Sequence, residues 1–377
     1  MRIGILAGET SGDQLGAGLI RAIKHHAPHA VFEGIAGPKM IEAGCSSFYP
    51  MEKLSVLGIV EVIKHYRELK AIRDHLIEHF IDSPPDVFIG IDLPDFNLPM
   101  ERKLKEAGIP TVHYVSPTVW AWRPGRVHGI AKSVNLMLTM FPFENEIYEQ
   151  HNVPVEFVGN PIADMFPMQP DRTVARHKLD IPEQAKVIAL LPGSRVSELQ
   201  RHADLFIKTA TWCHEKNPDV QFIVPLASKE LRHIFENTLQ QLGTNLPITL
   251  FDGQSHDVLM ACDAVLLASG TAAVEAMLMK RPMVVTYKLN WLSYRIMKAM
   301  LNVPYVCMPN NLAGSEIAPE FIQHNAKPEK MGPVLLDYLE HPEKSIPIIE
   351  KFTEIHQTLR KNADETAALA VLKLVTE

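Results

Sequence analysis

Two short turns rich in glycine and hydroxyl residues are the parts of this chain best suited to bind phosphate. They are Leu191-Pro-Gly-Ser-Arg195 and Ala268-Ser-Gly-Thr-Ala-Ala-Val-Glu275, and each follows an apolar run typical of a buried strand. Unpaired amides at the start of a helix, together with the helix dipole, attract phosphate, and the Arg195 guanidinium adds a fixed positive charge. The pair of turns therefore predicts two halves of one nucleotide-diphosphate site.

The residues of these turns expected to contact the nucleotide are Gly193, Ser194, Arg195, Ser269, Gly270, Thr271 and Ala272. Each turn alone is also compatible with a plain loop between a strand and a helix. Two common phosphate-binding fingerprints are absent: there is no Gly-x-x-x-x-Gly-Lys-Ser/Thr motif, and the spacing of Gly8, Gly12 and Gly16 does not fit Gly-x-Gly-x-x-Gly. We therefore expect a phosphate site of another type.

Asp92 is the candidate general base. It ends the predicted strand at residues 86–92, and ligands of open α/β sheets bind outside the carboxyl ends of the strands. A carboxylate there could take the proton from an attacking hydroxyl. Two alternatives remain open: Asp92 could only cap the next turn, a role that fits Asp95 better, and His113 could serve as the base instead.

Two further segments are candidates for binding the second substrate. Glu9 lies in a small-residue turn that opens a helix, where Thr10 or Ser11 is a natural N-cap, and Glu9 could bind sugar hydroxyls or only complement the helix N-terminus. The loop that follows residues 111–115 places Trp120 and Trp122 beside Arg123 and Arg126. Such a loop suits an anionic, partly apolar ligand, although tryptophans in loops also cover cores.

The segment at residues 56–80 has apolar residues at helical spacing, which a core-facing helix explains. Its early turns are apolar over a wider surface, with basic residues interleaved, and this pattern also suits acyl chains or anionic lipid headgroups. The residues that would make that contact are Val60, Val62, Ile63, Tyr66 and Leu69.

The elements that must position these residues alternate between short apolar strands and amphipathic helices along the whole chain. Such alternation predicts α/β architecture with doubly wound parallel sheets. A proline-rich stretch at residues 159–170 is the candidate linker between two Rossmann-like domains, at residues 1–165 and 166–349. A helix at about residues 350–377 has an apolar face that could pack back on the first domain.

Composition excludes several classes of protein. A length of 377 residues fits two domains, and a net charge of −7 without a basic stripe argues against nucleic acid as a partner. The four cysteines form no Cys-x-x-Cys pair, which suits free thiols. No apolar stretch approaches the roughly 18 residues of a membrane span. No His, Asp and Glu cluster has metal-ligand spacing, so we expect neither a metal nor a cofactor.

Eight motifs together give the chain an end-to-end resemblance to lipid-A-disaccharide synthases. They are Gly8-Glu-Thr-Ser-Gly-Asp13, Gly34-Ile-Ala-Gly-Pro38, Gly58-Ile-Val-Glu-Val62, Gly90-Ile-Asp-Leu-Pro-Asp-Phe-Asn97, Tyr114-Val-Ser-Pro-Thr-Val-Trp-Ala-Trp122, Leu191-Pro-Gly-Ser-Arg195, Ala268-Ser-Gly-Thr-Ala-Ala273 and Pro309-Asn-Asn-Leu-Ala-Gly314. The resemblance implies a GT-B fold, with two facing Rossmann-like domains and a cleft between them. It also implies an inverting, metal-independent transfer of 2,3-diacylglucosamine from UDP-2,3-diacylglucosamine to the 6-hydroxyl of 2,3-diacylglucosamine 1-phosphate.

Roles follow from the same resemblance. Asp92 matches the essential carboxylate of the family, Arg195, Glu275 and Asn310 match positions that line the UDP pocket, and Ser11 falls on the first-domain side of that pocket. The family uses the region near residues 56–70 at a membrane surface, so the resemblance implies a peripheral protein at the cytoplasmic face of the inner membrane. It also implies a possible homodimer with exchanged C-terminal parts.

Three other readings of the sequence remain open. A UDP-N-acetylglucosamine 2-epimerase shares the double Rossmann plan and would act on the soluble UDP-sugar alone. A non-catalytic nucleotide-sugar or lipid binding module would not need Asp92. A glycosyltransferase for muropeptide lipids would differ in its acceptor.

Overall fold

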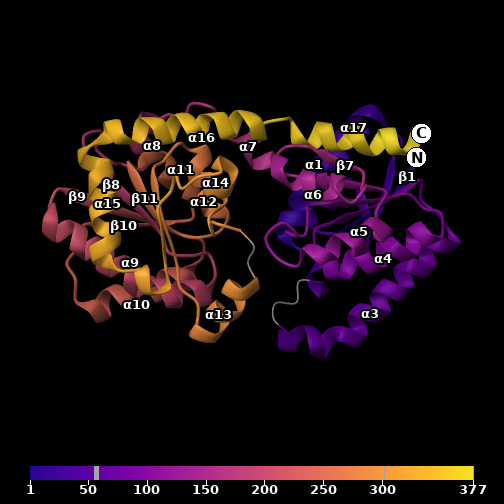
Figure 1. Cartoon of the computed structure of the whole chain (residues 1–377), viewed down its shortest axis with the longest axis horizontal. Helices are drawn as coiled ribbons and strands as arrows, with labels where there is room; N and C mark the ends of the chain where they lie inside the picture. Colours follow the sequence, from indigo (N-terminus) through magenta and orange to yellow (C-terminus); the bar gives the residue numbers. More distant parts are fainter. Residues whose placement is uncertain (55–58, 301–302, 377) are drawn as a thin grey trace. The chain divides into compact units, whose positions relative to one another are not determined.

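The computed structural model describes residues 1–54, 59–300 and 303–376, except for some side chains within 59–64 and 292–299. The chain divides into two compact units (Figure 1). The first unit comprises Met1–Asp164 with Leu359–Glu377, and the second comprises Met165–Thr358. Each unit has its own parallel sheet, covered by helices.

The first sheet has seven parallel strands in the order β3-β2-β1-β4-β5-β6-β7. They are β1 (Arg2–Ala7), β2 (Val31–Ala36), β3 (Cys45–Pro50), β4 (Val87–Ile91), β5 (Thr111–Tyr114), β6 (Leu136–Thr139) and β7 (Val155–Phe157). The central strands are apolar on both faces because helices cover both sides of the sheet. The direction in which strands are added reverses between β1 and β4, and ligands of doubly wound sheets bind at such a point.

The helices of the first unit follow its strands. They are α1 (Thr10–His26), α2 (Pro38–Glu42), α3 (Ile59–Asp82), α4 (Pro94–Glu106), α5 (Val127–Ser133), α6 (Asn145–Glu149) and α17 (Ala363–Thr376), and α7 (Pro161–Met165) ends at the boundary of the unit. Helix α1 lies close to the sheet because it carries glycines on its inner face. A Cβ on Gly16 would lie 3.0 Å from Ile91 Cδ1 and 2.5 Å from Met40 Sδ.

The C-terminal helix α17 is part of the first unit (Figure 1). Its buried residues Ala367, Ala368 and Val371 join the core formed by α1 and the sheet. The Asp164 carboxylate accepts hydrogen bonds from the amides of Asn362 and Ala363, at 2.9 and 2.6 Å, and so satisfies donors at the start of α17. The last helix therefore completes the core that the first residues begin.

The second sheet has six parallel strands in the order β10-β9-β8-β11-β12-β13. They are β8 (Lys186–Leu191), β9 (Val220–Leu226), β10 (Ile248–Asp252), β11 (Ala264–Ala268), β12 (Met283–Tyr287) and β13 (Glu320–Ile322). Its helices are α8 (Arg172–Lys178), α9 (Val196–Lys216), α10 (Lys229–Leu242), α11 (Ser255–Ala261), α12 (Thr271–Leu278), α13 (Trp291–Met300), α14 (Met308–Ala313), α15 (Pro328–Glu340) and α16 (Ile346–Leu359). Here the strand order reverses between β8 and β11.

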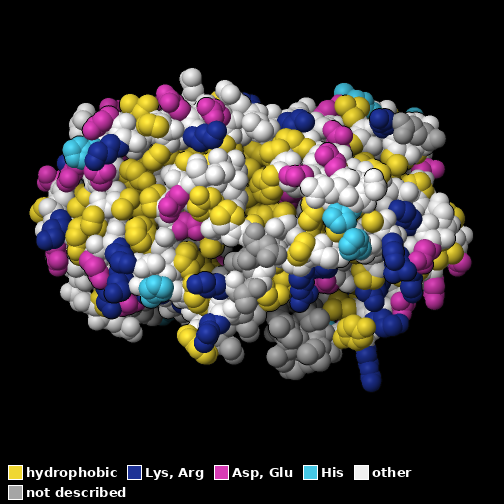
Figure 2. Space-filling view, in the orientation of Figure 1, with side chains coloured by type: hydrophobic (Ala, Val, Ile, Leu, Met, Phe, Trp, Pro, Cys, Tyr) yellow, Lys and Arg dark blue, Asp and Glu magenta, His cyan; other side chains and the backbone are white. Residues whose placement is uncertain are grey.

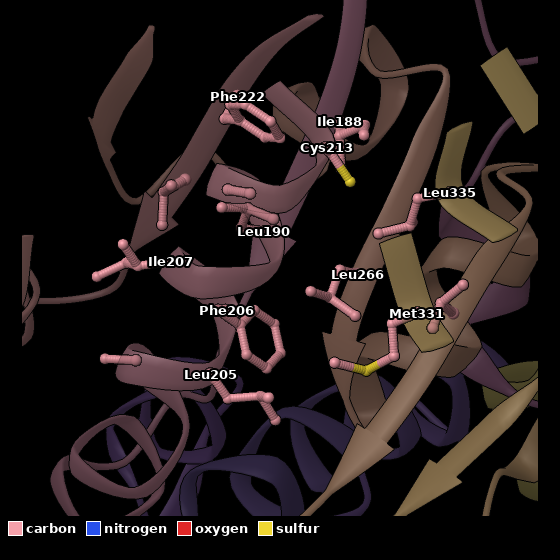
Figure 3. Close-up of a cluster of buried hydrophobic side chains, with 14 of the residues drawn as sticks. Ile188, Leu190, Leu205, Phe206, Ile207, Cys213, Phe222, Leu266, Met331 and Leu335 are labelled. Carbon is pink, nitrogen blue, oxygen red and sulfur yellow. The ribbon is translucent and has the colours of Figure 1, made fainter. Parts of the chain in front are cut away.

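The core of the second unit lies between this sheet and two helices (Figure 3). Leu190 of β8 and Leu266 of β11 point toward Phe206 of α9 and Met331 of α15, and all four are fully buried. All four cysteines are buried free thiols. No helix in the described part of the chain is long and apolar enough to cross a membrane.

Candidate functional site

In the first unit, two predicted site segments meet where the strand order reverses. Ala7 pairs with Ile91 in adjacent β1 and β4, so the turn after β1 and the turn that carries Asp92 leave the same edge of the sheet side by side. Gly8 is packed so closely there that an added Cβ would lie 2.6 Å from Leu93 Cδ2. The two turns thus form one site within this unit.

The Asp92 backbone is held in a left-handed conformation. Its φ is +52° and that of Leu93 is +48°, and two consecutive non-glycine residues in this region are costly, about 1 to 2 kcal/mol each. Two hydrogen bonds hold the turn: the Asp92 amide donates to Tyr114 O at 2.8 Å, and Asn97 Nδ2 donates to Asp92 O at 2.7 Å. The Asp92 side chain is half-buried and is therefore open to a ligand.

The structure does not support the capping alternatives for this turn. The N-cap residue of α4 is Leu93, and no side chain caps the helix. The Asp95 side chain is instead 90% exposed and forms an ion pair with Arg126 at 2.7 Å.

His113 is not placed to act on a substrate. It is fully buried, and its Nδ1 contacts Glu101 Oε1 at 2.7 Å, with Glu101 equally buried. Burial raises the pKa of the Glu101 carboxyl. This pair lies against β4, because a Cβ on Gly90 would lie 2.0 Å from Glu101 Oε1. His113 is therefore a structural residue, and the half-buried Asp92 is the acid-base candidate that a ligand can reach.

Glu9 and Ser11 are both exposed in the turn next to Asp92. The prediction of Thr10 or Ser11 as N-cap is wrong, because Glu9 occupies that position and no side chain caps α1. Asp13 is buried and accepts hydrogen bonds from the amides of Lys39 and Met40, at 3.0 and 2.9 Å. Its carboxylate therefore anchors the start of α2 rather than that of α1.

The loop after β5 is ordered by its two tryptophans. Trp122 Nε1 donates to Thr118 Oγ1 at 3.0 Å, and the Arg123 guanidinium lies 4.5 Å from the Trp122 ring centroid. Trp120 Nε1 donates to Glu144 Oε1 at 3.1 Å. Burial raises the pKa of Glu144 to about 7, although hydrogen bonds from Phe141, Trp120 and Met140 oppose the shift. Glu144, which the sequence analysis missed, therefore anchors this loop.

A groove of about 630 Å³ lies beside the Asp92 turn in the first unit. It is lined by Pro94, Asp95, Leu98, Pro99, Arg102, Lys103, Glu106, Gly125, Arg126, Gly129, Ile130 and Ser133. We call it the α4–α5 groove. Three of its side chains are cationic, and Leu98 and Ile130 add buried apolar surface.

The predicted lipid-contact helix is described only in part. Tyr66 of α3 is 55% exposed, whereas Leu69 is half-buried and packs on the core. The side chains of Val60, Val62 and Ile63 lie outside the described residues. Lysine and arginine side chains are exposed about α3, but acidic side chains lie among them, as on the rest of the visible face (Figure 2). Lys70 pairs with Asp74, and Glu68 pairs with Lys53.

In the second unit, the two phosphate-binding turns also leave adjacent strands. Leu191 pairs with Leu267 in β8 and β11, where the strand order reverses. Ser194 and Arg195 are exposed and Gly193 is half-buried, with φ +135°. The amides of Ser194 and Arg195 both donate to Glu198 Oε2, at 3.1 and 3.4 Å. An anion at this turn would therefore meet the Arg195 side chain, which is 66% exposed, rather than these amides.

The second turn has open amides. Helix α12 begins at Thr271 after Gly270, and no side chain caps it. Gly270 and Thr271 are exposed, Ser269 and Ala272 are half-buried, and Ser269 Oγ donates to Val306 O at 3.4 Å. Uncapped amides at a helix N-terminus, one strand away from Arg195, form a suitable site for a phosphate.

The two remaining donor-site candidates are already engaged with protein groups. Glu275 Oε1 lies 3.7 Å from His256 Nε2, and hydrogen bonding to Glu275 raises the pKa of His256. Asn310 is fully buried: its Nδ2 donates to Ala318 O and Glu320 Oε1, and its Oδ1 accepts from the amides of Ile317 and Ala318. The amide of Asn310 thus fixes the segment before β13.

One group of possible metal ligands comes together that the sequence spacing did not indicate. His25 and His26, at the end of α1, and Glu365, in α17, place ligand atoms within 4.8 Å of one another. Glu365 is 339 residues from His26 in sequence, which is why no motif reveals the group. Both histidines are exposed.

Comparison with known proteins identifies close relatives of this chain. Residues 3–371 match a family model described as lipid-A-disaccharide synthetase. A lipid-A-disaccharide synthase of Methylobacillus flagellatus is 51% identical over 374 residues, which cover 99% of this chain and 99% of that protein. The protein of the same name from Hahella chejuensis is 50% identical over 375 residues, covering 100% of this chain and 94% of its own length.

Solved structures with the same fold are more distant in sequence. A UDP-GlcNAc 2-epimerase of Neisseria meningitidis bound to UDP-GlcNAc has a TM-score of 0.63 at 13% identity, covering 99% of this chain and 100% of its own. A calicheamicin glycosyltransferase has a TM-score of 0.61 at 14% identity, covering 100% of this chain and 98% of its own. At this identity the likeness shows the fold alone, and it confirms the GT-B prediction of two parallel-sheet α/β domains.

Proposed function

We infer the function of this chain from the family to which it belongs, the lipid-A-disaccharide synthases, which makes it a hexosyltransferase of lipid A biosynthesis. Beyond the family assignment, we propose that it transfers 2,3-diacylglucosamine from UDP-2,3-diacylglucosamine to the 6-hydroxyl of 2,3-diacylglucosamine 1-phosphate. The products are a β-1,6-linked disaccharide 1-phosphate and UDP. The observation that carries the proposal is the half-buried Asp92 at the strand-order reversal of the first sheet.

We propose that Asp92 removes the proton of the acceptor hydroxyl as that hydroxyl attacks the anomeric carbon of the donor. The attack comes from the face opposite UDP, so the configuration at this carbon inverts. Asp92 is suited to the role because its turn is fixed by Asn97 and Tyr114 while its side chain remains accessible. General-base catalysis of this kind contributes roughly a hundredfold to ten-thousandfold.

The second unit is the proposed donor site. The Arg195 guanidinium and the open N-terminus of α12 would stabilise the diphosphate as negative charge builds on it. Glu275 and Asn310 would lie next to the nucleotide. Asn310 would hold its segment in place, because the hydrogen bonds of its side-chain amide all go to protein groups. Ser11 would approach the donor from the first unit.

The first unit is the proposed acceptor domain. Arg126 is close to the Asp92 turn through its ion pair with Asp95, and Arg123 lies in the same loop against Trp122. Glu9 is exposed in the turn beside the base. The two arginines suit a phosphorylated sugar, since guanidinium groups bind phosphate with two parallel hydrogen bonds. The exposed Tyr66 and the basic side chains of α3 would face the headgroups of the inner membrane at its cytoplasmic side.

The decisive experiment supplies purified protein with both lipid substrates and a metal chelator, and follows disaccharide and UDP by mass spectrometry. We expect disaccharide from wild-type protein and a loss of kcat of at least about a hundredfold in Asp92→Asn, with donor KM little changed. Glu106→Gln, which removes an exposed carboxylate of α4 that pairs only with Arg102, serves as the control for general disturbance of the helix. Near wild-type turnover by Asp92→Asn would remove Asp92 from the role, and consumption of the UDP-sugar without acceptor would favour an epimerase.

A further inference from the structure

A second groove in the molecule lies on the opposite edge of the second sheet from the donor turns. We call it the amino-edge groove; it has a volume of about 350 Å³. Its lining is Arg172, Glu183, Gln184, Ala185, Lys186, Asp263, Lys280, Arg281, Pro282, Tyr338, Leu339, Pro342, Ser345 and Ile349. Lys186 starts β8, and Asp263 and Pro282 directly precede β11 and β12, so the groove lies at the amino ends of these strands. One strand length, about 17 Å, separates it from the donor turns.

Positive charge exceeds negative charge in this groove. Asp263 is the shared partner of two guanidinium groups, those of Arg172 and Arg176, the second at 2.9 Å, and it also accepts a hydrogen bond from the Val187 amide at 2.9 Å. Arg281 is a third guanidinium in the same electrostatic environment. Asp263 is therefore paired with two guanidinium groups and forms no ion pair with the third. The other carboxylate of the lining, Glu183, is exposed.

The positive charge of Arg281 is not balanced by a paired anion among the described residues of this groove. Its Nε is buried and has no hydrogen-bond partner, and no described carboxylate lies within the 4.0 Å that defines an ion pair. Burial, with the nearby positive charges of Arg172 and Arg176, lowers the pKa of Arg281 below its usual value. Arg281 as a whole is half-buried, but leaving its buried Nε without a hydrogen-bond partner is costly, and a bound anion would remove that cost.

Two further donors face the same groove without partners. Ser345 is 4% exposed, and its Oγ is buried without a hydrogen bond. The Lys186 ammonium forms no hydrogen bond or ion pair with the described residues. Lys280 also lines the groove, but its ammonium already has partners, because its Nζ donates to Leu278 O and contacts His356. A guanidinium, a hydroxyl and an ammonium with unused hydrogen-bonding capacity thus line one groove.

We propose that the amino-edge groove is a binding site for the phosphate group of a small phosphorylated molecule, separate from the donor site. Arg281, Ser345 and Lys186 would donate to the phosphate oxygens, which accept several charge-assisted hydrogen bonds at once. Tyr338, Leu339 and Ile349 line the groove with apolar surface for an uncharged organic part. Neither the family assignment nor the proposed reaction requires this site.

The test must separate this site from the donor site, which also binds phosphate. The full-length protein is first saturated with UDP, and inorganic phosphate or phenyl phosphate is then titrated by calorimetry. We expect both probes to bind with UDP present, and phenyl phosphate to bind more tightly because its ring adds apolar contact. Loss of all phosphate binding once UDP is saturating would overturn the proposal, since the donor turns would then account for it.

Variants assign the binding to the groove. Arg281→Met keeps the apolar stem and should weaken phosphate binding by about tenfold or more, as expected for a lost charged hydrogen bond. Ser345→Ala and Lys186→Gln should each weaken it by a few-fold, and both are mild enough to preserve the fold if Arg281→Met does not. Lys216→Gln removes an exposed cation elsewhere in the unit and should leave binding unchanged. Equal weakening by Lys216→Gln, or none by the groove variants, would contradict the assignment.

Discussion

Asp92 and Leu93 both adopt left-handed backbone angles, and Asn97 is the side chain that holds them there. We predict that Asn97→Ala lowers kcat by roughly tenfold to a hundredfold. The loss of a buried hydrogen bond costs about 1 to 3 kcal/mol of stabilisation of the turn and lets Asp92 move. KM for both substrates should change little, since Asn97 is fully buried and does not reach them. Steady-state kinetics measure both quantities.

The matched control on the same helix is Glu106→Gln, because Glu106 is exposed and forms only a surface ion pair with Arg102. It should leave kcat within about twofold of wild type. If Asn97→Ala raised KM while kcat stayed constant, Asn97 would be a binding residue rather than a positioning residue for Asp92.

Glu144, which anchors the loop of Trp120, should make the stability of the fold depend on pH. Its pKa is raised to about 7 by burial, so the folded state holds a proton that the unfolded state has released. This group therefore lowers the free energy of unfolding as pH rises from about 4.5 to 7, by roughly 3 kcal/mol, with no further change above that range. Glu144→Gln cannot ionise, so the difference in unfolding free energy between wild type and variant should follow this slope in urea titrations. If the difference in unfolding free energy did not change with pH, the pKa of Glu144 would not be raised in the folded protein.

Among the elements, strands and helices with strong periodicity were predicted well, and contacts between distant segments were not. The predicted strand at residues 86–92 agrees closely with β4, at Val87–Ile91, because it is an apolar run between clear breaks. The edge strands β3 and β13 give no comparable signal, since neither has an apolar run. The position of Asp92 directly after a buried strand could be predicted from the sequence, whereas Glu101 and Glu144 contact partners that only folding brings near.

Strand β2 contains a bulge that depends on one glycine. The register with β3 shifts between Gly34 and Ile35, and a Cβ on Gly34, at φ +154°, would lie 1.9 Å from the backbone oxygen of Ile5. Neither backbone can move without breaking the sheet, so Gly34→Ala should cost more than about 3 kcal/mol of stability. Gly129→Ala is the control, since nothing lies within 4 Å of its added Cβ, and this change within helix α5 should be neutral or stabilising by about 0.5 to 1 kcal/mol. Thermal unfolding of the two variants tests the comparison.

The molecule as a whole has two cores, and the chain returns to the first of them at its end. Sequence patterning predicted a helix near the C-terminus with an apolar face. It did not show that the Asp164 carboxylate would bind the amides of Asn362 and Ala363, because that contact joins residues almost 200 positions apart. The two units should therefore differ in their response to the loss of α17.

Deleting residues 363–377 removes Ala367, Ala368 and Val371 from the core of the first unit and exposes their partners on α1. We expect the unfolding temperature of the first unit to fall by roughly 10 °C, as a loss of about 3 kcal/mol implies for a unit of this size, while that of the second unit stays the same. Tryptophan fluorescence separates the units: a protein that keeps only Trp120 and Trp122 reports on the first, and one that keeps only Trp212 and Trp291 on the second. Leu369→Ser is the matched control, because Leu369 of the same helix is 50% exposed. An equal fall in both transitions would mean that the two cores do not unfold independently.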